Sequence, residues 1–416
     1  MPSSWLPVTV SAMSGVFTRL VGQSAVESEL VGAAWAARGD SPHGTAGTGS
    51  MTHAWLITGP PGSGRSVAAL CFAAALQCTS ESTPGCGQCR ACTTAMAGTH
   101  ADIRRVIPEG LSIGVDEMRD LVAAASRRPS TGRWQIVIIE DADRLTEGGA
   151  NVLLKVVEEP PASTVFLLCA PSVDPEDIAI TLRSRCRHVA LLTPSADDIA
   201  QVLMERDGLA EAEARWAAAV SGGHVGRARR LATDPEARAR RDRALGMARD
   251  AATPSRAYAA VEELVAAAKA EAVSLTERRN EAEAEELLVA LGSGGTGKGT
   301  AAVPRGSAGP LKELEKRQKS RRTRAERDAL DRALVDLATY FRDALMVSSG
   351  ADAVSVSHPD MSDRVAALAA HAPRDRLLRC IEAVLACREA LAGNVKPKFA
   401  VDAMVATMGQ ALRSGE

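Results

Sequence analysis

The segment AWLITGPPGSGRS, residues 54–66, decides the fold of the amino-terminal half of the chain. Its first residues form an apolar run that predicts a buried β-strand, and the residues after it predict a helix that starts near Ser66. Glycines separate the two elements in the pattern G-x-x-x-x-G-K-[ST], with Arg65 in the lysine position. This order predicts a phosphate loop, in which backbone N–H groups at the helix start surround phosphate oxygens. A glycine-rich turn without a ligand is the alternative.

The candidate phosphate-binding residues follow from that pattern. Ser66 is placed to ligate Mg²⁺ through its hydroxyl. The planar Arg65 guanidinium is bulkier than the compact ammonium that usually lies between the terminal phosphates. We therefore expect ATP or ADP to bind with Mg²⁺ and hydrolysis to be weak or absent. The full set is Gly59, Pro60, Pro61, Gly62, Ser63, Gly64, Arg65 and Ser66.

A second glycine-rich segment, GSGGTGKGT at residues 292–300, contains Lys298 but is not expected to bind phosphate. Gly299 stands where the metal-binding hydroxyl residue belongs. The preceding EAEAEELLVAL predicts a helix, so no strand enters this loop. The composition of residues 292–310 is typical of a flexible linker.

An acidic pair ends the apolar segment WQIVIIED, residues 134–141. Hydrolytic P-loop proteins place an Asp at the end of such a strand to hold Mg²⁺, and in many of them the next Glu orients the attacking water. Here the order is reversed, because Glu140 precedes Asp141. The exchange moves each carboxylate by about one methylene, and such errors can slow a reaction by orders of magnitude. Capping of the following helix is the alternative role.

Strand-like and helical segments alternate through the first half of the chain. This alternation predicts a parallel sheet covered by helices on both faces. From Pro194 onward the pattern is helical. The predicted strands lie at residues 54–59, in HADIRRVIP (100–108), and at 134–141, 164–170 and 188–192.

The composition excludes several classes of protein. With 416 residues, 46% hydrophobic and 24% charged, the chain is typical of a soluble globular protein of two or three domains. The formal net charge of −2 gives no global attraction to nucleic acid. No segment reaches the roughly 18 to 20 apolar residues that cross a bilayer, and residues 1–9 lack the pattern of a signal peptide. We expect a cytoplasmic protein without membrane contact.

Four cysteines lie within fifteen residues, in the pattern C-x7-C-x2-C-x2-C. In a reducing compartment such clustering favours a metal over disulfides. The short spacings allow four thiolates to converge on a tetrahedral zinc ion, and a closed shell of four ligands predicts a structural role. An iron–sulfur cluster is the second interpretation and unliganded cysteines are the third. The residues are Cys78, Cys86, Cys89 and Cys92.

Several motifs together resemble the bacterial clamp-loader subunits of the AAA+ family. Besides HAWLITGPPGSG and the inserted cysteine cluster, the chain is similar to this family in four further segments. The segments are VGQ (21–23), LLKVVEEPP (153–161), TLRSRC (181–186) and GNVKPKFAVDAM (393–404).

The resemblance implies roles for two arginines. Arg185, in the Ser-Arg-Cys motif, corresponds to an arginine finger that stabilises charge on the phosphoryl group transferred in a neighbouring subunit. Arg227 corresponds to the second nucleotide sensor of the family, and a polar sensor maps near Ser172 or Val173. From the residues alone, a surface arginine at a helix end and an ordinary exposed helix arginine are the alternatives.

The resemblance also implies the domain organisation. Residues 1–193 are expected to form an α/β AAA+ P-loop domain, a parallel sheet covered by helices, with a zinc-binding insertion at 78–92. Residues 194–240 are expected to form a small helical lid. An all-α carboxy-terminal collar domain is expected at 241–416, with a flexible glycine-rich and basic insertion at about 292–325.

The departures from the motor pattern favour the delta prime branch of this family. Arg65 and the Glu140–Asp141 order weaken the chain's own site, whereas the Ser-Arg-Cys motif is intact. The resemblance then implies a structural subunit of the DNA polymerase III holoenzyme with little ATPase and no polymerase activity. Its expected partners are gamma/tau and delta subunits in a pentameric ring, the sliding clamp, and primer-template DNA through the assembled complex. An active gamma/tau-type ATPase and a P-loop nucleotide kinase are the alternatives.

The basic stretch KELEKRQKSRRTR, residues 312–324, contains seven basic and two acidic side chains. It adjoins the glycine-rich segment and lacks interleaved aromatic residues. A solvated helical face or linker is therefore favoured over a DNA contact.

Overall fold

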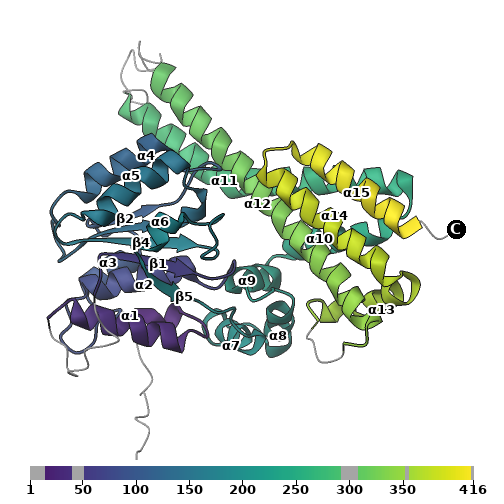
Figure 1. Cartoon of the computed structure of the whole chain (residues 1–416), viewed down its shortest axis with the longest axis horizontal. Helices are drawn as coiled ribbons and strands as arrows, with labels where there is room; N and C mark the ends of the chain where they lie inside the picture. Colours follow the sequence, from purple (N-terminus) through teal and green to yellow (C-terminus); the bar gives the residue numbers. More distant parts are fainter. Residues whose placement is uncertain (1–14, 40–50, 292–307, 352–355, 414–416) are drawn as a thin grey trace, which may run out of the picture. The chain divides into compact units, whose positions relative to one another are not determined.

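The computed structural model describes residues 15–39, 51–291, 308–351 and 356–413. The chain divides into two compact units (Figure 1). The first, here called the sheet unit, comprises residues 1–108, 112–211 and 223–227. The second, the helical unit, comprises residues 109–111, 212–222 and 228–416. Residues of the expected lid fall in both units, and the division into three domains at 193 and 240 stays a prediction.

A parallel five-stranded sheet forms the centre of the sheet unit (Figure 1). Every residue of β1, β3 and β4 is buried, as expected for strands covered on both faces. The observation confirms the predicted parallel α/β fold. The strand order is β2 (Ile103–Val106), β3 (Gln135–Ile139), β4 (Thr164–Ala170), β1 (Ala54–Thr58) and β5 (Arg187–Ala190).

Alternate side chains of the strands enter two apolar cores, one on each face of the sheet. Trp55 and Ile57 of β1 belong to the core beneath α1 and α2, whereas Leu56 belongs to the core beneath α4 and α5. The first face carries η1 (Val16–Arg19), α1 (Ser24–Ala36), α2 (Arg65–Gln77) and α3 (Arg90–Met96). The sheet unit also contains α4 (Val115–Ala125), η2 (Ala142–Arg144), α5 (Glu147–Glu158), α6 (Ile180–Arg183) and α7 (Ala196–Asp207).

Asp102 anchors the connection that leads into β3. Its carboxylate accepts hydrogen bonds from the backbone N–H groups of Ser130, Thr131 and Gly132, at 2.6 to 2.8 Å. The hydroxyls of Ser130 and Thr131 donate to it as well. Burial opposes the charge of Asp102, but these hydrogen bonds outweigh burial and hold its pKa well below the usual range.

Replacing Asp102 with Ala should destabilise the sheet unit, because five donors lose an acceptor that is only 2% exposed. We expect a loss of about 2 to 4 kcal/mol in the free energy of unfolding, measured by urea denaturation. The exposed Asp120 of α4 provides the control. Its replacement with Ala should change the free energy by less than about 0.5 kcal/mol. Equal effects of the two substitutions would contradict the anchoring role.

Only helices follow Leu191 in the described part of the chain, which confirms the all-α carboxy-terminal region. The large core of the helical unit is apolar and includes Phe341, Leu334, Leu377 and Val401. None of the described helices has the length and hydropathy needed to cross a membrane. The helices are α8 (Glu211–Ala219), α9 (Val225–Thr233), α10 (Pro235–Asp250), α11 (Pro254–Ala290), α12 (Ala308–Ser348), η3 (Pro359–Met361), α13 (Ser362–His371), α14 (Arg374–Ala392) and α15 (Pro397–Arg413).

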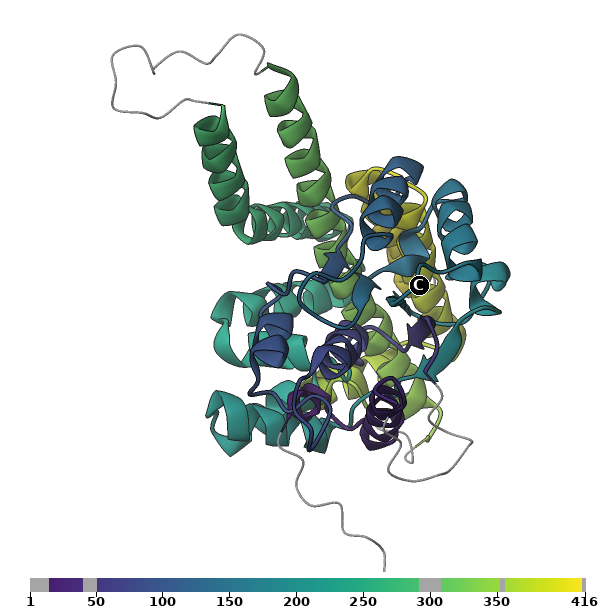
Figure 2. The same cartoon turned by 90° about the vertical axis from the view of Figure 1, so that its left-hand side faces the viewer.

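The basic stretch at 312–324 is helical, which differs from the flexible insertion expected through residue 325. It forms the first part of α12, which runs beside α11 (Figures 1 and 2). Arg321 supplies the physical reason, because its buried guanidinium donates to Glu283 at 2.9 Å and to Asn280 at 2.7 Å, both on α11. The second glycine-rich motif, 292–300, lies outside the described residues. DNA contact by the basic stretch stays a prediction.

A buried polar network joins α10, α12 and η3 within the helical unit. Arg241 pairs with Asp360 at 2.7 Å and donates to Nδ1 of His358 at 2.8 Å. Nδ1 of His358 is therefore an acceptor, and Nε2 carries the proton toward the carbonyl oxygen of Asp336 at 3.1 Å. Burial first, and then the Arg241 guanidinium, lower the pKa of His358 below its ordinary value.

This network predicts a loss of stability on acidification. The folded chain favours neutral His358, whereas the unfolded chain binds a proton once the pH falls below about 6.5. The free energy of unfolding should therefore decrease between about pH 7.5 and pH 5.5, and less steeply in His358→Gln. Replacing the exposed His371 with Gln provides the control. An unchanged pH slope in His358→Gln would contradict the neutral assignment.

Candidate functional site

The turn between β1 and α2 has the conformation that a phosphate loop requires. Gly62 and Gly64 have φ values of 91° and 96°, in a region that glycine adopts without steric cost. Helix α2 begins at Arg65, directly after the turn. The backbone N–H of Gly59 donates to the carbonyl oxygen of Pro171 at 3.2 Å, which attaches the turn to the end of β4. The first backbone N–H groups of α2 have no acceptor within the helix, so they can form an anion-binding site.

Two polar side-chain atoms of this turn are buried without a hydrogen-bond partner among the described residues. Ser63 is only 2% exposed, and its Oγ has no partner there. Nη1 of Arg65 is buried and unpaired in the same sense. Buried polar atoms are nearly always hydrogen-bonded in folded proteins. Phosphate oxygens would supply the missing acceptors, so these residues fit a bound nucleotide.

The acidic pair lies at the end of β3, as the sequence predicts. An arginine on the neighbouring strand β2 pairs with Glu140, the first residue of the pair. Nε and Nη2 of Arg105, on β2, donate to Oε1 of Glu140 at 2.9 and 2.5 Å. The Glu140 side chain is 15% exposed and that of Arg105 is 33% exposed, so the carboxylate is the more buried member of the pair. Asp141 lies 4.0 Å from Nε of Arg144. Sequence reasoning missed Arg105, because its proximity to Glu140 depends on the pairing of β2 with β3.

The charged groups of the phosphate loop and of the acidic strand end lie near the end of β4. Burial raises the pKa of the Cys169 thiol, Arg65 opposes this rise, and Glu140 and Asp141 add to it. Burial likewise raises the pKa of Asp143, with Arg65 opposing. The phosphate loop and the acidic strand end therefore form one electrostatic site.

Arg185 is held at the surface by its own chain. Its Nη1 donates to the carbonyl oxygen of Thr181 at 2.9 Å, and its Nη2 lies 2.5 Å from Glu158. The Arg185 side chain is 39% exposed. Glu158 ends α5, so the fold brings LLKVVEEPP and TLRSRC together. The role of Arg185 in a neighbouring site stays a prediction.

The start of α9 packs on the phosphate loop. A side chain at Gly62 would place its Cβ 2.5 Å from Cβ of His224, so only glycine fits there. Nδ1 of His224 accepts a hydrogen bond from the backbone N–H of Arg227 at 3.2 Å. This bond links Arg227, the predicted sensor, to a residue that contacts the loop. Sequence reasoning missed His224, and no local pattern marks it.

The two candidate positions for the polar sensor differ in their surroundings. Oγ of Ser172 donates to Asp177 at 2.6 Å and accepts from the backbone N–H of Asp174 at 2.9 Å. Val173 packs against the apolar core beneath α4 and α5. Ser172 therefore has its hydrogen-bonding capacity engaged in a local turn, and the register of the sensor stays open to experiment.

The four cysteines meet as their spacing predicts, and they can hold a metal ion. All four Sγ atoms lie within 4.8 Å of one another. Thiolates placed tetrahedrally at about 2.3 Å from zinc are about 3.8 Å apart, and Sγ atoms of Cys78 and Cys89 are 3.9 Å apart. Arg38, at the end of α1, fixes the loop by donating to the carbonyl oxygens of Cys78 and Ser80 at 2.9 and 2.6 Å.

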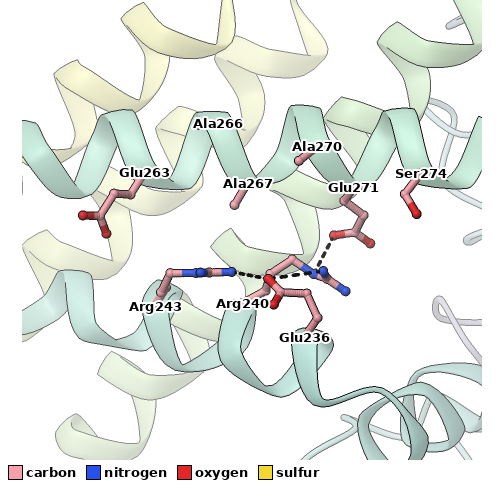
Figure 3. A pocket seen from close by; sticks show the side chains of 9 residues that line it. All are labelled: Glu236, Arg240, Arg243, Glu263, Ala266, Ala267, Ala270, Glu271 and Ser274. Carbon is pink, nitrogen blue, oxygen red and sulfur yellow. Dashed lines mark hydrogen bonds and ion pairs between the residues drawn. The ribbon is translucent and has the colours of Figure 1, made fainter.

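A hollow of about 590 Å³ lies between α10 and α11 of the helical unit (Figure 3). Arg240 pairs with Glu271 at 3.2 Å, and Arg243 pairs with Glu236 at 2.6 Å. With Glu263, the lining contains three glutamates and two arginines around three alanines. This balance gives no excess of positive charge for a phosphate, and the phosphate loop remains the candidate nucleotide site.

Two family models match the chain. The model of the DNA polymerase III delta subunit matches residues 43–195, which include the phosphate loop, the cysteine cluster and Arg185. The model of the carboxy-terminal part of the delta subunit matches residues 325–398. The chain belongs to the DNA polymerase III delta subunit family. Its sheet unit is a parallel α/β domain with a phosphate-loop motif between β1 and α2.

Curated relatives of this delta-family chain agree with the assignment. The delta prime subunit of Pseudomonas aeruginosa is 38% identical over 153 residues, 36% of this chain and 46% of that protein. The delta prime subunit of Escherichia coli is 36% identical over 158 residues, 37% of this chain and 46% of that protein. The gamma/tau subunit of Mycobacterium bovis is 34% identical over 142 residues, 34% of this chain and 24% of that protein. The matches span less than half of each relative.

Proposed function

We propose that the chain is a delta prime-type subunit of a bacterial clamp loader, which helps to place the sliding clamp on primed DNA. In this role it occupies a pentameric ring in the cytoplasm with gamma/tau and delta subunits, and it contributes Arg185 to the ATP site of a neighbour. The observation that carries the proposal is a contrast within the sheet unit. Arg185 is exposed at the surface, whereas the carboxylate expected to hold Mg²⁺, Glu140, is paired with Arg105.

The chain's own site has the parts for binding but is poorly equipped for cleavage. The loop conformation and the unpaired Ser63 and Arg65 atoms fit phosphate. Hydrolysis also requires a metal between phosphates and a group that orients water. Neutralised Glu140 is a weak metal ligand, and Asp141 is one methylene shorter than the usual base. ATP is then turned over mainly by neighbouring subunits.

Arg185 can act in a neighbouring site because its guanidinium is already oriented. Charge accumulates on the equatorial oxygens of the phosphoryl group during transfer, and a guanidinium from another subunit stabilises it. The contacts with Thr181 and Glu158 restrict a side chain that otherwise loses about 2 kcal/mol of rotamer entropy on ordering. The fold thus supplies an arginine that is positioned before assembly.

Replacing Arg185 with Ala should slow hydrolysis at the neighbouring ATP site by about 10³-fold or more, because the developing charge loses its stabilising cation, and DNA-stimulated turnover of the reconstituted clamp loader should fall by the share of that site. The measurement is steady-state phosphate release by the complex with gamma/tau and delta subunits. Arg183→Ala, two residues away at an exposed position, is the matched control and should retain turnover.

Full turnover and clamp loading by the Arg185→Ala complex would overturn the proposal. Hydrolysis by the isolated chain at the rate of the motor subunits would instead favour a gamma/tau-type ATPase. The two results are separable, because the first requires the assembled ring and the second requires the chain alone.

The cysteine cluster is proposed to hold a structural zinc ion. Four thiolates close the coordination shell, which leaves no position for substrate. The cluster lies where α2 and α3 meet the loop fixed by Arg38, and Gly85 packs on Val16 and Phe17 of η1. Zinc would therefore tie the amino-terminal segment of the described sheet unit to α2.

Replacing Cys89 with Ser should remove the bound zinc and lower the Tm of the purified chain, because three remaining thiolates no longer fill the shell. Zinc per chain is measured by inductively coupled plasma mass spectrometry, and Tm by differential scanning fluorimetry. Cys186→Ser, outside the cluster, should keep one zinc. Iron and sulfide in place of zinc would support the iron–sulfur interpretation instead.

A further inference from the structure

The carboxylates at the end of β3 do not fit a carboxylate-held Mg²⁺. Magnesium in nucleotide sites is bound through one or two carboxylates together with phosphate oxygens and water. Arg105 donates twice to Oε1 of Glu140, and the Glu140 side chain is 15% exposed. To bind a metal through this oxygen, Glu140 would have to give up two charge-assisted hydrogen bonds.

The other two acidic residues of this turn also lie beside arginines. Asp141 lies 4.0 Å from Nε of Arg144, within the same turn. Asp143 lies in η2, and the charges of Arg144 and Arg65 act on its carboxyl. The carboxylate at the position expected to hold the metal is therefore already engaged by Arg105, and the acidic residues after it have cationic neighbours.

The phosphate loop nevertheless retains two buried polar atoms, a hydroxyl oxygen and a guanidinium nitrogen, that lack hydrogen-bond partners among the described residues. Oγ of Ser63, on a side chain 98% buried, faces Gly59 at the first turn of the loop. Nη1 of Arg65 is buried and unpaired, and its charge is felt by Cys169 and Asp143 at the strand ends. A guanidinium forms strong, directed hydrogen bonds to phosphate.

We propose that this loop binds a nucleoside di- or triphosphate without a divalent cation, with the Arg65 guanidinium supplying the positive charge that Mg²⁺ supplies in other phosphate loops. The Arg105–Glu140 pair makes this possible by removing the negative charge that would otherwise repel the phosphates. The inference rests on the nucleotide-binding part of the proposed function and is independent of the role of Arg185. Its consequence is a subunit that binds nucleotide without cleaving it, because cleavage needs the metal.

Isothermal titration calorimetry of the full chain with ADP and with ATP tests the proposal. Each titration is made in excess Mg²⁺ and in EDTA with matched ionic strength. The two dissociation constants should agree within about twofold, because no metal bridge contributes to binding. Arg65→Ala should weaken binding roughly tenfold or more in both buffers, as expected when a charge-assisted hydrogen bond is lost.

The Arg105→Ala variant tests whether the Arg105–Glu140 pair is the reason that binding does not need Mg²⁺. The substitution exposes the Glu140 charge to the phosphates, so binding in EDTA should weaken roughly tenfold and Mg²⁺ should restore it. Arg104→Ala, on the same strand and equally exposed, is the matched control and should remain insensitive to Mg²⁺. Circular dichroism establishes that each variant is folded.

Binding that requires Mg²⁺ in the unaltered chain would overturn the inference, and so would a chain that binds neither nucleotide in either buffer. Equal metal sensitivity of Arg105→Ala and Arg104→Ala would overturn the part assigned to the Arg105–Glu140 pair. None of these results alters the expected loss of turnover in the Arg185→Ala complex. Failure of this inference is therefore distinguishable from failure of the proposed clamp-loader role.

Discussion

All five strands of the sheet run in the same direction, and their carboxyl ends consequently meet at one edge. This constraint places the phosphate loop after β1, the acidic pair after β3 and the turn after β4 beside one another. One direct result is the hydrogen bond from the N–H of Gly59 to the carbonyl oxygen of Pro171. Another is that Arg65 and Glu140 both act on the pKa of the Cys169 thiol. Every chemical property assigned to the site depends on this convergence.

Within that frame, three arginines of the sheet unit have different uses because their surroundings differ. Arg105 is paired with a largely buried carboxylate, which neutralises Glu140. Nη1 of Arg65 is a buried donor without a partner among the described residues, and phosphate is its proposed acceptor. Arg185 is paired with the half-exposed Glu158, and a surface pair of this kind holds its partner by only about 0 to 1 kcal/mol. Such a weak contact can orient a guanidinium and still release it to a partner subunit.

In the proposed role, these differences separate cleavage of the chain's own nucleotide from the contribution of Arg185 to a neighbouring site. The proposed loss of metal binding concerns the end of β3, whereas the elements next to Arg185 are α5 and α6. The cysteine cluster and Asp102 stabilise other parts of the same unit. A change in nucleotide chemistry at the end of β3 therefore leaves the geometry around Arg185 and the cysteine cluster unaltered.

Local patterns in the sequence were sufficient for much of the fold and for part of the site. The predicted limits of β4 agree with the structure, and the cysteine spacing brings four thiols together. The strand, turn and helix around Gly62 were also evident, because glycine placement and apolar periodicity are properties of adjacent residues. Helix α12 extends over the basic stretch because Arg321 finds partners on α11, which the composition of 312–324 does not reveal.

The sequence by itself determined the phosphate loop, the parallel α/β class, the cysteine cluster and the motif around Arg185. Only the tertiary structure decided that Glu140 is neutralised by Arg105, that Glu158 holds Arg185, and that His224 covers Gly62. The physical reason is sequence separation. Secondary structure and metal-ligand spacing are encoded by neighbouring residues, whereas these contacts join residues 27 to 162 positions apart and depend on strand order and helix packing.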